Sequence, residues 1–125
     1  MKKTITIPKA PKPLGPYSQA VVKNDTLYVS GQIPLDPFTS EKRFDDISTA
    51  TEQVMRNIEA LVQHAGFEMT DIVKCSIFLK SLDDFTAVNR IYETYFQEDP
   101  PARETIEVKK LPLDAPLEIS CIAQR

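Results

Sequence analysis

Apolar residues recur along the chain with two different periods, and these periods predict two helices and about six strands. The longest helical pattern covers residues 46–65, where apolar side chains return every three or four positions. A second helical pattern begins at Phe85 and stops near Pro100, because proline breaks a helix. Patterns typical of short strands lie at residues 4–7, 17–22, 27–30, 71–80, 103–108 and 117–123.

Turn and capping residues mark the ends of these elements. Asn24-Asp25, between two short β-prone runs, predicts a hairpin. Asp45 or Asp46 can cap the start of the first helix, and Gly66 can end it in the left-handed conformation. The order β-β-β-α-β-α-β-β predicts a single α+β domain over residues 1–125. In this domain both helices cover one face of one mixed sheet.

The other face of the predicted sheet is left without a cover. In the strand at residues 71–80, the side chains on this face are Lys74, Ser76 and Phe78, a mixture of polar and apolar groups. A partly apolar sheet face is stabilised by contact with a partner. We therefore expect a homo-oligomer whose sheet faces pack inward.

Composition and charge narrow the class of protein. Hydrophobic residues make up 42% of the 125 residues, which is enough to build one core. No run of 18 apolar residues is present, and the basic start Met1-Lys2-Lys3 is not followed by an apolar signal segment, so we expect a cytoplasmic protein. The formal net charge of −3 and the scattered Lys and Arg residues argue against nucleic-acid binding.

Cysteine and histidine usage excludes several common kinds of site. Cys75 and Cys121 each fall inside a strand pattern, no CxxC motif is present, and His64 is the only histidine. The common Cys/His zinc sites built within one chain are therefore excluded. His64 lies near the end of an amphipathic helix, which argues against a His-based catalytic triad.

Arg103 is the most informative single residue. It follows Pro100-Pro101 and precedes an alternating strand pattern, so it stands at the start of a strand. A guanidinium group on a rigid backbone can bind a carboxylate through two charge-assisted hydrogen bonds. Taken alone, the residue is more typical of a surface arginine in an ion pair, because exposed arginines are common.

Four further positions are candidates for chemistry. Tyr17 begins a strand, Gly31 leaves one after Ser30, and Glu118 faces away from the apolar side of the last strand. Asn89 lies inside the second helix. Each also has an ordinary structural explanation. Tyr17 can be an aromatic packed at a sheet edge, and Gly31 can serve only to allow a turn. Glu118 can be a solvated strand residue, and Asn89 a polar residue that faces solvent.

Together, these positions fall within segments that resemble the signature segments of the RidA/YjgF family of reactive-intermediate deaminases, in the family's order, from about Pro13 to Arg125. The segments are Gly15-Pro16-Tyr17-Ser18-Gln19-Ala20, Val29-Ser30-Gly31-Gln32-Ile33-Pro34, Phe85-Thr86-Ala87-Val88-Asn89, Pro101-Ala102-Arg103, and Leu117-Glu118-Ile119 with Ile122-Ala123.

The resemblance implies a chorismate-mutase-like α+β fold and a homotrimer. In such a trimer three sheets surround a central barrel, and a ligand site lies in each cleft between subunits. It also implies hydrolysis of 2-imino acids, such as 2-iminobutanoate and 2-iminopropanoate, to 2-keto acids and ammonia, without a cofactor.

The resemblance further implies roles for single residues. Arg103 would bind the substrate carboxylate, and Glu118 would orient or deprotonate the attacking water. Tyr17 would wall the pocket and relay a proton or hold the water. The remaining substrate-binding positions would be Ser30, Gly31, Asn89 and the main chain near Thr105.

The chain departs from the family pattern at two places. Many members carry a cysteine where this chain has Thr105, and the loop at residues 38–41 lacks the usual glycine. Three functions besides deamination are compatible with the sequence. The first is a regulatory trimer in which the same arginine holds a keto acid without turnover. The second is an endoribonuclease or translation inhibitor, as some relatives have been called, and the third is a holdase-like chaperone.

Overall fold

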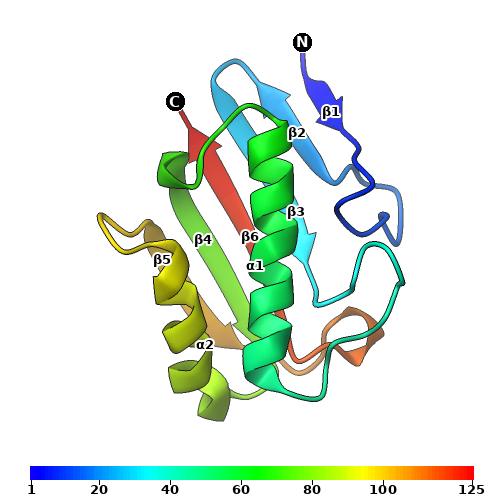
Figure 1. Cartoon of the computed structure of the whole chain (residues 1–125), viewed down its shortest axis with the longest axis vertical. Coiled ribbons are helices and arrows are strands. Elements are labelled where there is room, and N and C mark those ends of the chain that lie inside the picture. The colour runs from blue at the N-terminus through cyan, green and yellow to red at the C-terminus, as the bar shows by residue number, and fades with distance from the viewer.

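The computed structural model, which describes residues 1–125, contains one six-stranded mixed sheet with both long helices on the same face (Figure 1). The sheet order is β1-β2-β3-β6-β4-β5. Only the β4–β5 pair is parallel. The predicted α+β class, the sheet and the placement of the helices are confirmed. The strands are β1 (Lys3–Ile5), β2 (Ala20–Lys23), β3 (Thr26–Gln32), β4 (Ile72–Leu79), β5 (Ala102–Glu107) and β6 (Leu117–Gln124).

Helix α1 (Ile47–His64) crosses the sheet over β3 and β6. It begins where predicted, because the carboxylate of Asp46 accepts hydrogen bonds from the backbone N–H of Thr49, at 3.3 Å, and from its hydroxyl, at 2.7 Å. Beyond its end, Gly66 has a φ of +84°, the left-handed conformation expected there. The buried side of α1 supplies much of the core, including Val54, Ile58 and Leu61.

Helix α2 (Phe85–Tyr92) ends well before Pro100, so the predicted length of the second helix is wrong. A single 3-10 turn, Glu93–Tyr95, follows it, and the hydroxyl of Thr94 donates to the carbonyl of Ile91. Phe96 then leaves helical geometry and turns into the core, where its ring centre lies 4.8 Å from that of Tyr92. Burial of this ring ends the helix before proline does.

The first strands are shorter than predicted because one side chain replaces part of the strand ladder. Gln19 is buried, and its amide oxygen accepts from the backbone N–H of Ile7 at 2.7 Å. Its amide nitrogen lies 2.9–3.1 Å from the carbonyl oxygens of Ile7, Ala10 and Pro11. Gln19 therefore satisfies the backbone of the proline-rich segment, which a sheet ladder could not do.

The sheet face opposite the helices carries two separate apolar pairs, and between them Ser76 lies opposite Ser120. Tyr28 lies opposite Ile122, and Phe78 lies opposite Ile106. Tyr28 and Ile106 are exposed, whereas Phe78 and Ile122 are half-buried. This is the uncovered face that the sequence predicts. Separately, none of the helices combines the length and the apolar character needed to cross a membrane.

We expect Gln19→Leu to lower the free energy of unfolding by at least about 2 kcal/mol, because the buried N–H of Ile7 and the facing carbonyls lose their partner. Urea unfolding followed by circular dichroism measures this loss. As a matched control, exposed Gln63→Leu on α1 should change the free energy by less than about 0.5 kcal/mol. Equal effects of the two substitutions would contradict the clamping role of Gln19.

Candidate functional site

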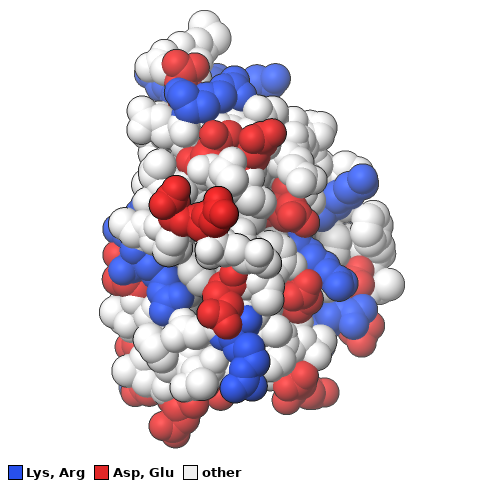
Figure 2. Space-filling view, turned by 60° about the vertical axis from the view of Figure 1, so that its left-hand side comes forward, with Lys and Arg blue, Asp and Glu red and all other residues white.

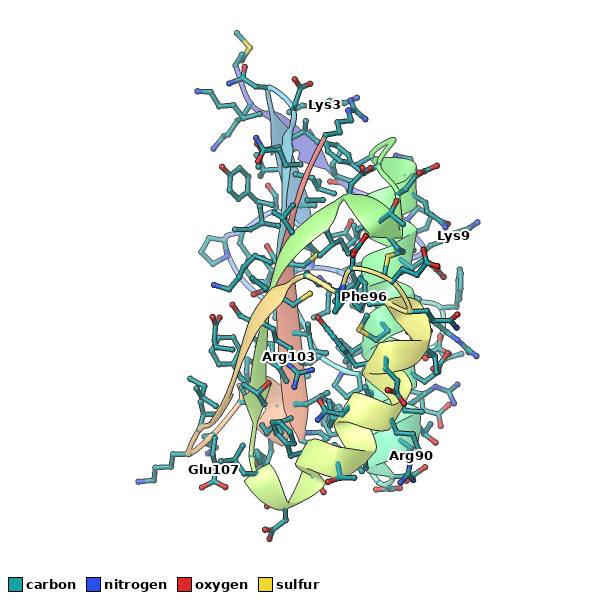
Figure 3. The ribbon with its side chains drawn as sticks, turned by 90° about the vertical axis from the view of Figure 1, so that its left-hand side faces the viewer. Lys3, Lys9, Arg90, Phe96, Arg103 and Glu107 are labelled. Carbon is teal, nitrogen blue, oxygen red and sulfur yellow. The ribbon has the colours of Figure 1, made fainter.

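Arg103, the second residue of β5, points toward α2 (Figure 3). It lies opposite Cys75 in the parallel β4–β5 pair, and Cys75 is buried beneath the helices. The guanidinium is half-buried, and its Nη2 donates a 2.7 Å hydrogen bond to Oδ1 of Asn89. The helix and the edge strand thus fix the position of this side chain together.

No carboxylate of the chain lies within ion-pair distance of Arg103. The adjacent carboxylate, Glu104, faces the opposite side of the sheet, where it lies 2.9 Å from Nζ of Lys74 and contacts the hydroxyl of Ser76. A guanidinium has five N–H donors, and only one of those of Arg103 bonds within the chain. A half-buried cation with free donors can bind an anion.

Thr105 lies two residues beyond Arg103 and on the same face of β5. Its hydroxyl oxygen is buried and has no hydrogen-bond partner. Because β5 is an edge strand, some of its backbone groups point away from the sheet. Near Thr105, the main chain is therefore more available to a ligand than the side chain is.

Glu118 lies on the open face of the sheet and over Gly31 of β3. A Cβ atom added at Gly31 would lie 2.6 Å from Cδ of Glu118, so the Glu118 side chain must shift before a larger residue fits there. Glu118 forms no ion pair or side-chain hydrogen bond, and burial raises the pKa of its carboxyl group above the ordinary value. A carboxylate with a raised pKa can accept a proton near neutral pH.

Tyr17 and Ser30 lie near the same glycine. Tyr17 is 47% exposed, lines a small hollow together with Gly31, and accepts a 2.9 Å hydrogen bond from the backbone N–H of Leu14. Ser30 donates its hydroxyl to the carbonyl of Ser18 at 2.6 Å. This bond joins the start of the Gly31 segment to the loop that carries Tyr17.

The predicted site residues therefore form two groups rather than one. We call Arg103, Asn89 and Thr105 the cationic half-site, and Tyr17, Ser30, Gly31 and Glu118 the acidic half-site. Glu118 of β6 pairs with Phe78 of β4, which in turn pairs with Ile106 of β5. Glu118 is therefore two strands away from β5, at the level of Ile106, which is three residues beyond Arg103. At about 4.8 Å per strand and 3.3 Å per residue, the two backbones are roughly 14 Å apart. The side chains also point to opposite faces, so one chain does not bring them to one small ligand.

The larger surface hollows lie elsewhere. One of about 440 Å³ follows the first half of α1 and is lined by charges that already have partners, such as Arg43 with Asp36 at 3.0 Å. Another, of about 540 Å³, lies between α1 and the segment at residues 7–9. No three His, Cys, Asp or Glu side chains are grouped in a way that could hold a metal ion.

Two residues that contact Arg103 are not identified as site residues by the sequence. The guanidinium carbon of Arg103 lies 4.8 Å from the ring centre of Tyr92 and 5.6 Å from that of Phe85. The helical pattern places both rings on the apolar side of the second helix. Their spacing with Asn89 could have identified them, because positions i, i+4 and i+7 share one face of a helix and Asn89 is a candidate site residue.

Comparison with known proteins assigns the chain to a family. The sequence profile of the endoribonuclease L-PSP family matches residues 7–125. The chain belongs to this family, which is also called YjgF/RidA. The resemblance and the fold that it implies are confirmed.

Three YjgF/RidA relatives illustrate the match. A RutC family protein of Sulfurisphaera tokodaii is 48% identical, and the alignment covers 98% of each chain. A 2-iminobutanoate/2-iminopropanoate deaminase of Salmonella typhimurium is 43% identical over all of this chain and 99% of its own. The crystal structure of E. coli TdcF with bound serine superposes with a TM-score of 0.94 at 36% identity, covering 98% of each chain.

We expect Gly31→Ala to lower the free energy of unfolding by about 1–3 kcal/mol, because the added methyl group collides with the Glu118 side chain. In a Glu118→Ala background the same substitution should cost less than about 0.5 kcal/mol. Urea unfolding of the four variants measures this coupling. Gly15→Ala is the control, since its methyl group would have ordinary 3.8 Å contacts. An equal cost in both backgrounds would contradict the contact.

Proposed function

We propose that the protein hydrolyses short 2-imino acids, such as 2-iminobutanoate and 2-iminopropanoate, to 2-keto acids and ammonia. The observation that carries this proposal is the half-buried Arg103, which has free donors and no carboxylate partner. A 2-imino acid offers the missing carboxylate next to the carbon that reacts. The Salmonella typhimurium relative named for this activity supports the same substrate class.

The proposed reaction begins when Arg103 binds the substrate carboxylate through its free N–H donors, which places the imine carbon. Glu118 removes a proton from a water molecule while the water oxygen bonds to that carbon. The carbon–nitrogen double bond becomes single, and the nitrogen takes up the proton that Glu118 removed. The hydroxyl proton of the resulting amino alcohol then passes through Glu118 to the nitrogen, the carbon–nitrogen bond breaks to release ammonia, and the carbon–oxygen double bond of the 2-keto acid forms. Tyr17 would hold the water or relay the proton.

Assembly of several chains would complete the site. The cationic half-site faces α2, and the acidic half-site lies on the open sheet face, so Arg103 of one chain needs Glu118 of another to act on one substrate. The two apolar pairs of the open face, Tyr28 with Ile122 and Phe78 with Ile106, favour covering of this face by other chains. We therefore propose a homotrimer with its sheets packed inward and one site in each cleft between chains.

The family's name includes ribonuclease activity, but the charges of this chain argue against RNA as a ligand. The net charge is −3, and on the face shown in Figure 2 acidic and basic side chains are interspersed without a broad basic area. RNA binding relies on clustered Lys and Arg along the phosphate backbone.

The proposed function is tested by competition for a transient imine. A pyridoxal-phosphate threonine dehydratase generates 2-iminobutanoate, semicarbazide traps it, and the wild-type protein should divert it to 2-ketobutanoate. Arg103→Ala should abolish saturable turnover, because the carboxylate loses its partner. Glu118→Gln should slow turnover more than it weakens 2-ketobutanoate binding. Wild-type turnover that survives in Arg103→Ala would exclude the site, and binding without turnover would indicate a regulatory trimer.

A second experiment tests whether the site is shared between chains. Arg103→Ala and Glu118→Ala chains are each expected to be inactive, but a mixed trimer contains one cleft in which both native residues meet. Random 1:1 mixing of unfolded chains followed by refolding should therefore restore about one quarter of the wild-type activity. Equilibrium sedimentation should show three times the 14.1 kDa chain mass. A monomer, or no recovery on mixing, would contradict the shared site.

A further inference from the structure

Three side chains of α2 surround the guanidinium of Arg103 from one side. Phe85, Asn89 and Tyr92 are spaced i, i+4 and i+7, so they share one helix face, and all three contact Arg103 of β5. Asn89 accepts a hydrogen bond from one N–H of Arg103. The guanidinium carbon lies 4.8 Å from the ring centre of Tyr92 and 5.6 Å from that of Phe85. These distances are within the range of cation–π attraction.

The two rings differ in how they are held. Tyr92 is 5% exposed and packs on Phe96 in the core, so its position is set by the fold. Phe85 is 41% exposed and stands at the first residue of α2. A ring left this open gains less from burial than a core ring does, and the Arg103 cation lies beside it.

The chemical consequence concerns orientation of the cation. An arginine side chain has several rotatable bonds and loses conformational freedom when it binds a ligand. The rings attract the positive charge without using any of its N–H donors, because ring faces carry no hydrogen-bond acceptor of the carboxylate kind. Held this way by the rings and by Asn89, the guanidinium keeps its remaining donors for an incoming carboxylate.

We propose that Phe85 and Tyr92 are positioning residues that pre-orient Arg103 for the carboxylate of the substrate. This inference rests on the proposed function for its role in turnover. Its structural part, the restraint of Arg103 by two rings, stands on the contacts alone. Since the carboxylate is bound both before and during reaction, loss of a ring should weaken binding more than it slows the chemical step.

The test compares variants that keep a ring with variants that lose it. Phe85→Leu and Tyr92→Leu should raise both the Kd for 2-ketobutanoate, measured by calorimetry, and the KM for the imine by roughly threefold to tenfold, with kcat changed by less than about twofold. Phe85→Tyr and Tyr92→Phe keep the ring and should stay within about twofold of the wild type. If Tyr92→Leu fails to fold, Phe85→Leu alone decides the test, because Phe85 lies at the surface and its substitution should leave the fold intact.

Phe67→Leu is the matched control. It removes a buried ring that lies 4.2 Å from the guanidinium carbon of Arg125, a cation that is bonded to the carbonyl of Gly66 outside both half-sites. This variant loses a cation–π contact and core packing, so its stability should fall while Kd and KM stay at wild-type values. A similar rise of KM in Phe67→Leu would show that general destabilisation explains the effect, and would overturn the inference.

A readout that does not depend on turnover separates the two proposals. Nuclear relaxation of the Arg103 Nε–H group should report an ordered side chain in the wild type and in Phe85→Tyr, and a more mobile one in Phe85→Leu. If the wild type neither binds nor converts the keto and imino acids, but the Arg103 side chain still becomes mobile in Phe85→Leu, the proposed function fails and the restraint of Arg103 stands. Unchanged Kd, KM and order in Phe85→Leu would overturn the inference itself.

Discussion

Alternation of side chains along β5 and β6 is the constraint on which the functional arrangement depends. In a strand, successive side chains point to opposite faces. Arg103 shares a face with buried Cys75, whereas Glu118 alternates with buried Leu117 and Ile119 and therefore faces the other way. A shift of β6 by one residue would bring Glu118 to the face of Arg103 and turn buried Leu117 and Ile119 to the open side, so the burial along β6 fixes the separation of the two charges.

Arg103 and Glu118 are also alike because neither has an ionic partner. Glu104 and Lys74 neutralise each other on the open face, and Arg43 and Asp36 do so beside α1, but neither Arg103 nor Glu118 has an ionic partner within the chain. A half-buried charge without a partner is costly to the folded state. That cost is understandable where a ligand or a second chain supplies the missing charge, and this is the pattern expected of a site assembled between copies.

Much of the fold follows from local sequence signals, and the differences arise from long-range contacts. Asp46 and Gly66 bound α1 through interactions with near neighbours in sequence, so both ends could be predicted. The early end of α2 depends on the packing of Phe96 against Tyr92 within the core, which the periodicity of the helix does not contain. The sequence marks Gly31 as a position for close approach, but the group that approaches it, Glu118, is distant in sequence. Helical periodicity alone assigns Phe85 to the core, because it does not distinguish a ring packed on aliphatic residues from a ring beside a cation.

Thr105 illustrates how the structure changes the meaning of a departure from the family pattern. The resemblance places a cysteine at this position in many members, so its replacement by threonine raises the question of a lost reactive group. The hydroxyl oxygen of Thr105 is buried and unpaired, and it faces the covered side of β5 rather than solvent. In that setting the hydroxyl is less available to a ligand than the free backbone groups of the edge strand are. We therefore expect this position to offer the backbone of an edge strand to the cationic half-site, and a backbone contact is the same with threonine as with cysteine.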